Sequence, residues 1–105
     1  MSNDDLQKGF PASARTFEDF QAAAKALGFD EALIREWAPM TVLDEHTHPF
    51  DANALVTQGE MWLSCGGDTR HLVPGDTFMV PTGTPHAERY GSQGATYWVA
   101  RRNPR

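Results

Sequence analysis

The sequence predicts a small all-β protein, a sandwich or barrel of short strands preceded by one short helix. After Gly28 the chain divides into segments rich in β-branched and aromatic residues, which turn-forming glycines and prolines separate at intervals of roughly 8 to 12 residues. Before Gly28 one segment has the spacing of apolar residues that an amphipathic helix requires. A chain of 105 residues buries one core but is too short for two, so we expect a single domain.

The helix is predicted over residues 16–27. Thr16 is a typical N-cap residue with Asp19 three positions later, and Gly28 follows the segment as a stop signal. The apolar side chains that fall on one helical face, and are expected to pack on the core, are Phe17, Phe20, Ala24 and Leu27. The preceding residues 1–15 are rich in small and polar residues, so we expect a flexible N-terminal arm there.

Short strands account for the rest of the chain. Each predicted strand ends at a proline, a glycine or a short turn, because these residues interrupt regular strand pairing. The predicted strands are residues 31–37, 41–48, 52–58, 60–65, 69–73, 77–80, 86–90 and 96–102. In this scheme Gly59 separates the third strand from the fourth, and the segment Gly-Ser-Gln-Gly at 91–94 separates the last two.

Composition and charge exclude several classes of protein. The net charge is −5, and the only basic group is formed by the three arginines of residues 100–105, so a nucleic-acid-binding surface is not expected. We expect those arginines to lie on a solvated tail. No apolar stretch approaches the roughly 18 residues of a membrane span, and the N-terminus does not resemble a secretory signal. We therefore expect a cytoplasmic protein that does not bind membranes.

His46 and His48 are separated by one residue, and this spacing suggests a metal site. On a strand both side chains point to one face with their Cα atoms roughly 6 to 7 Å apart, so two imidazoles can converge on one ion. A surface strand with two incidental histidines has the same spacing, and the pair alone does not decide between these interpretations. His86 opens a later strand after turns at Pro74–Gly75 and Pro81–Gly83, and this arrangement can present a third ligand.

Together the two histidine-containing segments resemble the two sequence motifs of the cupin superfamily. The first motif runs G-x5-H-x-H-x3-E-x6-G, and the second runs P-G-x5-P-x-G-x2-H-x3-N. His46, His48 and Gly59 stand at their places in the first motif. The second motif is matched at every fixed position up to its histidine, namely Pro74, Gly75, Pro81, Gly83 and His86. The resemblance covers roughly residues 31–100.

Three positions depart from the cupin pattern. Met40 stands at the first glycine, Ala52 at the glutamate and Tyr90 at the asparagine. A gap one residue longer would place Asn53 at the glutamate, but the spacing to Gly59 favours Ala52. The carboxylate that completes the cupin ligand set is therefore in doubt.

The resemblance implies a small antiparallel, jelly-roll-like β-barrel over residues 16–105, including the helix, with a divalent transition metal near its mouth. By the same resemblance the metal ligands are His46, His48 and His86. Three imidazoles do not identify the ion: iron is expected first, and zinc, nickel, manganese and copper are compatible. The resemblance also implies a homodimer. The fourth histidine, His71, falls outside both motifs and is expected on the surface.

Two acidic residues near the first motif are candidates for supporting the ion. Asp51 adjoins the vacant glutamate position but faces the opposite way on a regular strand, so it reaches the ion only if the chain bulges. Asp44 lies two residues before His46 on the same face. Two roles stay open for Asp44: a carboxylate that orients the imidazole, or a solvated acid at the rim of the barrel.

Glu88 and Tyr90 follow His86 with the same alternation, so both are expected to face the interior. We expect Glu88 to line the cavity or to reach the ion through water, with direct ligation as the less favoured alternative. Without a functional role, Glu88 would be a carboxylate paired with Arg89 or Arg35. We assign Glu88 and Tyr90 as candidate catalytic residues for proton transfer.

The three-histidine set also predicts a type of chemistry. Neutral imidazoles add no charge, so a divalent ion keeps its full positive charge and, if octahedral, has about three open positions. This favours a small anionic or enolisable substrate bound together with water or O2. We therefore predict a non-haem metal-dependent oxygenase. Two other functions stay open: binding of a metal or metabolite without turnover, and metal-assisted isomerase or lyase chemistry.

Overall fold

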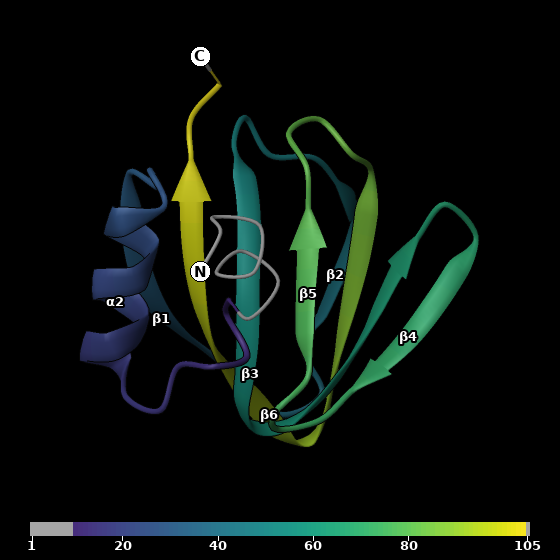
Figure 1. Cartoon of the computed structure of the whole chain (residues 1–105). Helices are drawn as coiled ribbons and strands as arrows, with labels where there is room; N and C mark the ends of the chain where they lie inside the picture. Colours follow the sequence, from purple (N-terminus) through teal and green to yellow (C-terminus); the bar gives the residue numbers. More distant parts are fainter. Residues whose placement is uncertain (1–9, 105) are drawn as a thin grey trace.

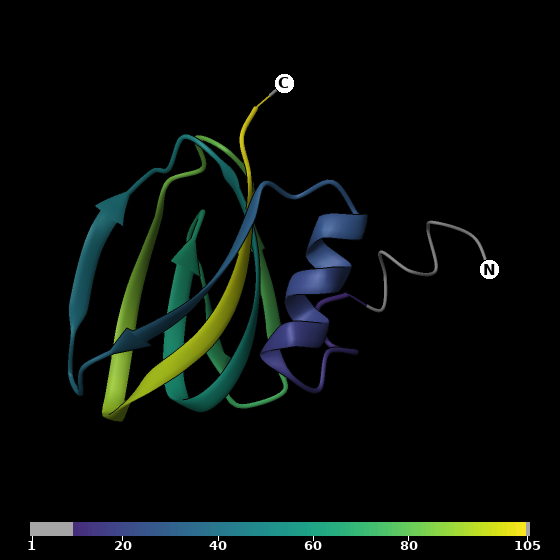
Figure 2. The same cartoon turned by 90° about the vertical axis from the view of Figure 1, so that its left-hand side faces the viewer.

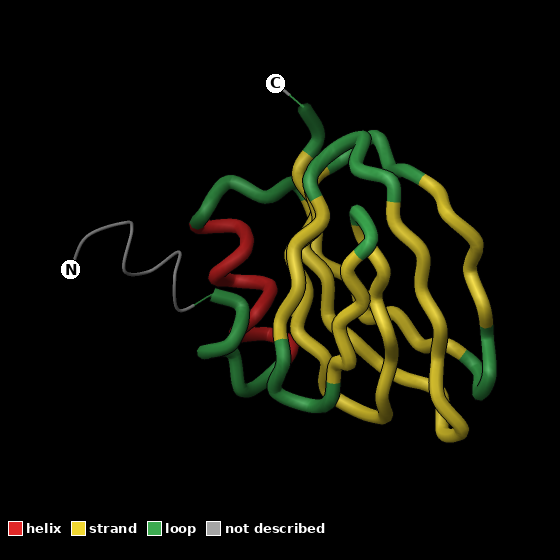
Figure 3. Tube along the Cα trace, turned by 90° about the vertical axis from the view of Figure 1, so that its right-hand side faces the viewer, coloured by secondary structure: helices red, strands yellow, loops and turns green. Residues whose placement is uncertain are grey.

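Two long strands, β3 (Asp51–Cys65) and β6 (His86–Arg102), organise the fold. The computed structural model describes residues 10–104, in which these two strands pair antiparallel along nearly their whole length. Every other strand pairs with one of them: β1 (Glu31–Trp37) and β2 (Val42–His46) with β6, β4 (Asp68–Leu72) and β5 (Thr77–Val80) with β3. The resulting 6-stranded sheet curves round a common interior (Figures 1 and 3). The predicted all-β fold with one short helix is confirmed.

Two predicted strand ends are wrong, because glycine bends these strands without ending them. Gly59 lies within β3, and residues 91–94 continue β6 where a turn was expected. Gly59 and Gly94 have φ angles of 75° and 68°, and the β3–β6 register shifts beside Gly59. A Cβ atom at Gly59 would lie 2.1 Å from the carbonyl oxygen of Gly94, so the two backbones approach each other too closely for a side chain.

Helix α2 (Phe17–Ala26) forms where the sequence predicts it. The Thr16 side chain accepts a hydrogen bond from the backbone N–H of Asp19 at 3.1 Å, and Gly28 follows the helix with a φ of 89°. The helix lies on the outer side of the sheet (Figure 2). The described chain contains no helix with the length and apolar character that crossing a membrane requires.

A cluster of aromatic side chains joins α2 to the outer face of β6. Phe20 is fully buried and contacts Trp98 edge-on, with ring centroids 5.9 Å apart. Phe10 packs against Phe20 at 5.1 Å, so the end of the predicted arm, residues 10–15, lies near the helix. The rest of the predicted arm, residues 1–9, lies outside the described residues.

The main core fills the concave face of the sheet. Its buried members come largely from alternate positions of β3 and β6, together with side chains of β4 and β5. Among the described residues, the buried polar or ionisable side chains, apart from the tyrosines, are His86 and Glu88, which are 2% and 6% exposed. Leaving such groups without partners costs about 1–3 kcal/mol each, so their surroundings indicate what this interior does.

Candidate metal centre

Three histidines from two separate parts of the chain meet inside the barrel. His46, His48 and His86 each offer one ring nitrogen, and these atoms all lie within 4.8 Å of one another. An ion bound to three imidazoles at about 2.1 Å holds the nitrogens roughly 3 to 3.5 Å apart, so small shifts of the rings suffice to bind it. The histidines are therefore positioned to bind a metal, as the sequence predicts.

An irregularity in β2 helps to bring the histidines together. His46 pairs with His86 across β2 and β6, and the register shifts between Leu43 and His46 because β2 carries an extra residue there. β2 ends at His46, earlier than predicted, so His48 lies in the segment that follows the strand. The rings of His46 and His48 are nevertheless 5.4 Å apart.

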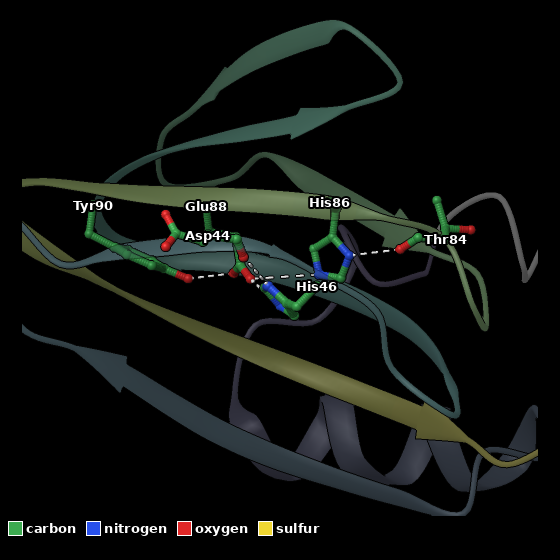
Figure 4. Close-up of polar contacts among 6 residues, drawn as sticks. All are labelled: Asp44, His46, Thr84, His86, Glu88 and Tyr90. Atoms are coloured by element: carbon green, nitrogen blue, oxygen red, sulfur yellow. Dashed lines mark hydrogen bonds and ion pairs between the residues drawn. The ribbon is translucent and has the colours of Figure 1, made fainter.

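Backbone carbonyl groups orient two of the three rings. Nδ1 of His46 donates to the carbonyl oxygen of Asp44 at 2.7 Å, and Nδ1 of His86 donates to that of Thr84 at 3.0 Å (Figure 4). A proton fixed on Nδ1 leaves Nε2 free to bind a metal. Asp44 thus orients His46, but with its backbone and not with the carboxylate that was considered.

His48 provides a test of whether these residues fit an ion. Its Nδ1 atom is buried and has no hydrogen-bond partner among the described residues. Burial, followed by the neighbouring His86, His46 and Arg101, lowers the pKa of His48 from 6.5 to about 4. The ring is therefore neutral at pH 7, which is the form that binds metals. A neutral ring with an unpartnered buried nitrogen fits the donor set of a divalent transition metal.

Glu88 lies beside the histidines and contacts Tyr90. Its Oε2 atom is 3.4 Å from Nε2 of His46 and 3.7 Å from Nε2 of His86. Its Oε1 atom accepts a hydrogen bond of 2.5 Å from the Tyr90 hydroxyl (Figure 4). One carboxylate therefore connects the candidate metal-binding nitrogens with a buried phenol.

The surroundings of Tyr90 keep its hydroxyl protonated. Burial, followed by Tyr97 and Glu88, raises the pKa of Tyr90 far above its ordinary value of 10. Trp37 stacks on the Tyr90 ring with centroids 5.2 Å apart. Tyr90 is thus a fixed hydrogen-bond donor to Glu88 over the accessible pH range.

The alternative partners of Glu88 are engaged elsewhere. The guanidinium carbon of Arg89 lies 4.5 Å from the centroid of the Trp62 ring, and that of Arg35 lies 4.9 Å from the Trp37 ring. The hydrogen bond and the close ion contacts of the Glu88 carboxylate are with Tyr90, His46 and His86. Its expected position facing the interior is what the structure shows.

Asp51 points away from the histidines. Its Oδ1 atom accepts hydrogen bonds from the backbone N–H and the hydroxyl of Thr82, at 2.8 and 2.9 Å, and its Oδ2 atom contacts Arg102 at 3.4 Å. The backbone hydrogen bond from Thr82 is the largest cause that lowers the pKa of Asp51. The register of β3 is regular at this residue, so the bulge that would turn Asp51 inward is not formed.

A cavity of about 30 Å³ adjoins the histidines. Its lining includes His48, His86, Glu88 and the vacant glutamate position Ala52. It also includes Arg101, whose side chain is 25% exposed. The prediction that Arg101 lies on a solvated tail is wrong, because its side chain lines this cavity from β6.

Sequence reasoning missed Arg101, although a signal for it was present. Tyr97, Val99 and Arg101 alternate along the last predicted strand, and alternation places them on one face. His71, in contrast, lies on the surface as predicted. It is paired with Glu60 at 2.8 Å and stacked on Trp62.

Comparison with known proteins agrees with this geometry. A family model for the cupin domain matches residues 33–100. Among curated proteins, none matches the chain. KdgF from Halomonas sp. is 25% identical with a TM-score of 0.64, and the match covers 71% of this chain and 69% of that one.

Two further solved structures share the fold. The DMSP lyase DddQ from Ruegeria pomeroyi is 27% identical with a TM-score of 0.64, and the match covers 70% of this chain but 38% of the lyase. A protein of unknown function from Rhizobium leguminosarum has a TM-score of 0.68 at 19% identity, over 87% of this chain and 96% of that one. The family match spans all three clustered histidines, and the chain belongs to the cupin domain family.

Proposed function

We propose that this chain is a mononuclear metal-dependent enzyme, in the first instance a non-haem oxygenase, that acts on a small anionic or enolisable metabolite. The observation that carries the proposal is the convergence of three histidine nitrogens within 4.8 Å beside the buried Glu88 carboxylate. When bound, a divalent ion would polarise a substrate oxygen and, if redox-active, give access to O2.

The chain's own residues divide the work at this site. His46, His48 and His86 hold the ion without neutralising it, because all three would bind as neutral imidazoles. The Tyr90 hydroxyl occupies Oε1 of Glu88 and leaves Oε2 directed towards the histidines as the atom that takes or returns a substrate proton. Apolar residues supply part of the cavity lining and limit the access of water to this side of the site: Phe50, Phe78, Val80 and Val99.

A second candidate, metal-assisted isomerase or lyase chemistry, is favoured by the Glu88–Tyr90 pair. Isomerases and many lyases depend on moving a proton next to a carbonyl or carboxylate group, and a buried carboxylate that a phenol holds in place beside an ion suits that step. The DMSP lyase at 27% identity supports this alternative, although the match covers 38% of that protein.

Metal content gives the first test. Protein from cultures supplemented with iron, manganese or zinc is expected to carry about one ion per chain, and His48→Ala far less. His71→Ala removes an exposed histidine outside the cluster and should retain the metal. A wild type that holds no more metal than His48→Ala in every medium would refute the proposal.

Oxygen use then separates the reaction classes. Iron-loaded protein is mixed with a panel of small carboxylates, and oxygen consumption that disappears in His86→Ala supports the oxygenase. Turnover that proceeds without oxygen identifies isomerase or lyase chemistry instead. Tight ligand binding without turnover across the panel would show a binding protein and contradict both enzymatic assignments.

We also infer a cytoplasmic homodimer. Large apolar side chains are exposed on β1 and near the start of β2, namely Ile34, Met40 and Val42, and such side chains favour an interface with a second copy. The single cysteine is consistent with a reducing compartment. A monomeric mass in light scattering at micromolar concentration would contradict the dimer, and fractionation of the native host tests the location.

A further inference from the structure

Ala52 and Arg101 stand directly opposite each other on the paired strands β3 and β6. Cβ atoms of such pairs are roughly 4.5 to 5.5 Å apart, and both residues line the cavity beside the histidines. Ala52 occupies the position at which the cupin motif carries a glutamate. In this chain a methyl group therefore replaces the carboxylate, and the residue across from it brings a positive charge.

The Arg101 side chain is fixed by a stack that leads to a candidate metal ligand. Its guanidinium carbon lies 4.5 Å from the centroid of the Phe50 ring. The Phe50 ring is parallel to that of His48, with centroids 4.6 Å apart and an interplanar angle of 4°. Arg101, Phe50 and His48 thus form one layered group, which sets the guanidinium at a defined place relative to the histidines.

The hydrogen-bonding capacity of Arg101 is incompletely used. Its Nη1 atom contacts the Glu31 carboxylate at 3.3 Å, but Glu31 is half exposed, and ion pairs of this kind are weak. Its Nε atom is buried and has no partner among the described residues. A guanidinium is built to bind a carboxylate through two parallel hydrogen bonds, so a second acidic group can still be accommodated.

We propose that Arg101 binds the carboxylate of the substrate, and that this carboxylate enters the space left open at Ala52. The inference rests on the proposed function, because it takes the histidines to hold a cation. Three neutral imidazoles leave that cation's charge in place, Arg101 adds another positive charge, and Glu88 offsets only part of the total. A free cavity of about 30 Å³ admits a small group, so the ligand class is a compact metal-chelating carboxylate such as an oxo or hydroxy acid.

The structural alternative is that Arg101 serves only to pair with Glu31 at the sheet edge. That alternative explains neither the buried, unpartnered Nε atom nor the place of Arg101 in the cavity lining. Arg102, the next residue, offers a natural comparison. It lies on the outer face of β6 with Asp51 and Phe29. Removing the charge of Arg102 therefore changes the net charge as much as removing that of Arg101, but leaves the cavity intact.

The test uses cobalt-loaded protein with oxalate as the carboxylate probe and acetohydroxamic acid as a chelator that has no carboxylate group. Binding is followed by cobalt absorption and by calorimetry. Arg101→Gln should weaken oxalate binding by at least about tenfold, the size expected for a lost charge-assisted pair, and change acetohydroxamic acid binding little. Arg102→Gln should match the wild type for both probes, and Arg101→Lys should recover part of the oxalate affinity. Circular dichroism checks that each variant is folded.

Ala52→Glu supplies an independent second variant. The new carboxylate would fill the open space opposite Arg101, so this variant is expected to keep cobalt and lose oxalate binding. Equal oxalate affinity in the wild type, Arg101→Gln and Ala52→Glu, all cobalt-loaded, would overturn the inference. A wild type that binds no cobalt would refute the proposed function instead. If that metal-free protein binds oxalate and Arg101→Gln abolishes the binding, the anion site is supported. Any other result with oxalate overturns the anion site.

Discussion

The two halves of β6 face the same interior but build different walls of the cavity. Residues 86–90 pair with β2 and the end of β3, whereas residues 95–102 pair with β1 and the start of β3. The first half presents His86, Glu88 and Tyr90, which are joined to one another or to backbone groups by hydrogen bonds and short contacts. The interior face of the second half ends at Arg101, whose buried Nε atom has no partner among the described residues.

This difference suits the two halves of β6 to two different tasks. The first half is a completed polar network, which suits groups that must keep one position through a reaction. The second half is mostly apolar and keeps hydrogen-bonding capacity in reserve, which suits recognition of a ligand. We therefore expect substitutions in the first half to affect metal binding or turnover. Substitutions at the end of the second half should affect substrate affinity.

Removing His86, the candidate metal ligand on the first half of β6, should have the largest effect. His86→Ala is expected to weaken metal binding by at least about 100-fold, because the ligand set loses its most buried member. Titration with zinc followed by calorimetry measures the change. His71→Ala serves as the matched control, since it removes an exposed imidazole outside the cluster. Equal affinities in the two variants would exclude the three-histidine site.

Neutralising the Glu88 carboxylate tests the first half of β6 in a second way, with a smaller expected effect. Glu88→Gln keeps the shape of the side chain but removes its basic oxygen, so turnover should fall about 100-fold while metal content stays the same. Tyr90→Phe removes only the hydrogen bond to Oε1 and should cost less, about tenfold. Loss of metal in Glu88→Gln would instead identify Glu88 as a direct ligand.

A substitution at Gly59 of β3 tests its close contact with Gly94, which lies between the two halves of β6. A Cβ atom there would meet the Gly94 carbonyl oxygen at 2.1 Å, in a backbone with positive φ, so Gly59→Ala should lower the free energy of unfolding by about 3 kcal/mol. Gly66→Ala is the control: its φ is 61° and its surroundings are open, which leaves about 1 kcal/mol of backbone strain. Urea unfolding distinguishes the two. Equal losses of unfolding free energy in the two variants would mean that the close approach of β3 and β6 at Gly59 adds nothing to the cost of the substitution.

A smaller effect is expected from acid on the metal-free protein. The pKa of His48 is about 4 in the folded protein and 6.5 in an unfolded chain, so between these values only the unfolded chain binds the proton. Stability should therefore decline as the pH falls from about 6.5 to about 4 and be unaffected by this group above that range. Urea unfolding of wild type and His48→Gln at several pH values measures this decline in stability. An identical pH profile in the two proteins would contradict its attribution to His48.

The fold was predictable from the sequence where local signals were unambiguous. The Thr16 cap, the helical stripe and the turns around β4 and β5 all lie where predicted. Gly59 misled because a glycine with positive φ can either end a strand or bend one. Which of the two occurs depends on the neighbouring strand, and the pairing with Gly94 is not visible in the local sequence.

The candidate site was predictable through its histidines and less so through its charges. The motif spacing identifies His46, His48 and His86, and alternation places Glu88 beside them. The role proposed for Arg101 depends on the β3–β6 register, which sets this residue opposite Ala52. Two bends shift that register, so counting residues along either strand could not have shown the pairing.

The long β3–β6 pairing also determines when the site can exist during folding. It joins positions as distant in sequence as Asp51 and Arg102, and contacts of that range make folding slow, on the order of milliseconds to seconds for β-rich domains. His86 reaches His46 and His48 only when its strand is in place. An ion shared by the three would therefore stabilise the whole barrel against global unfolding, and little of its affinity would be retained by partly folded chains.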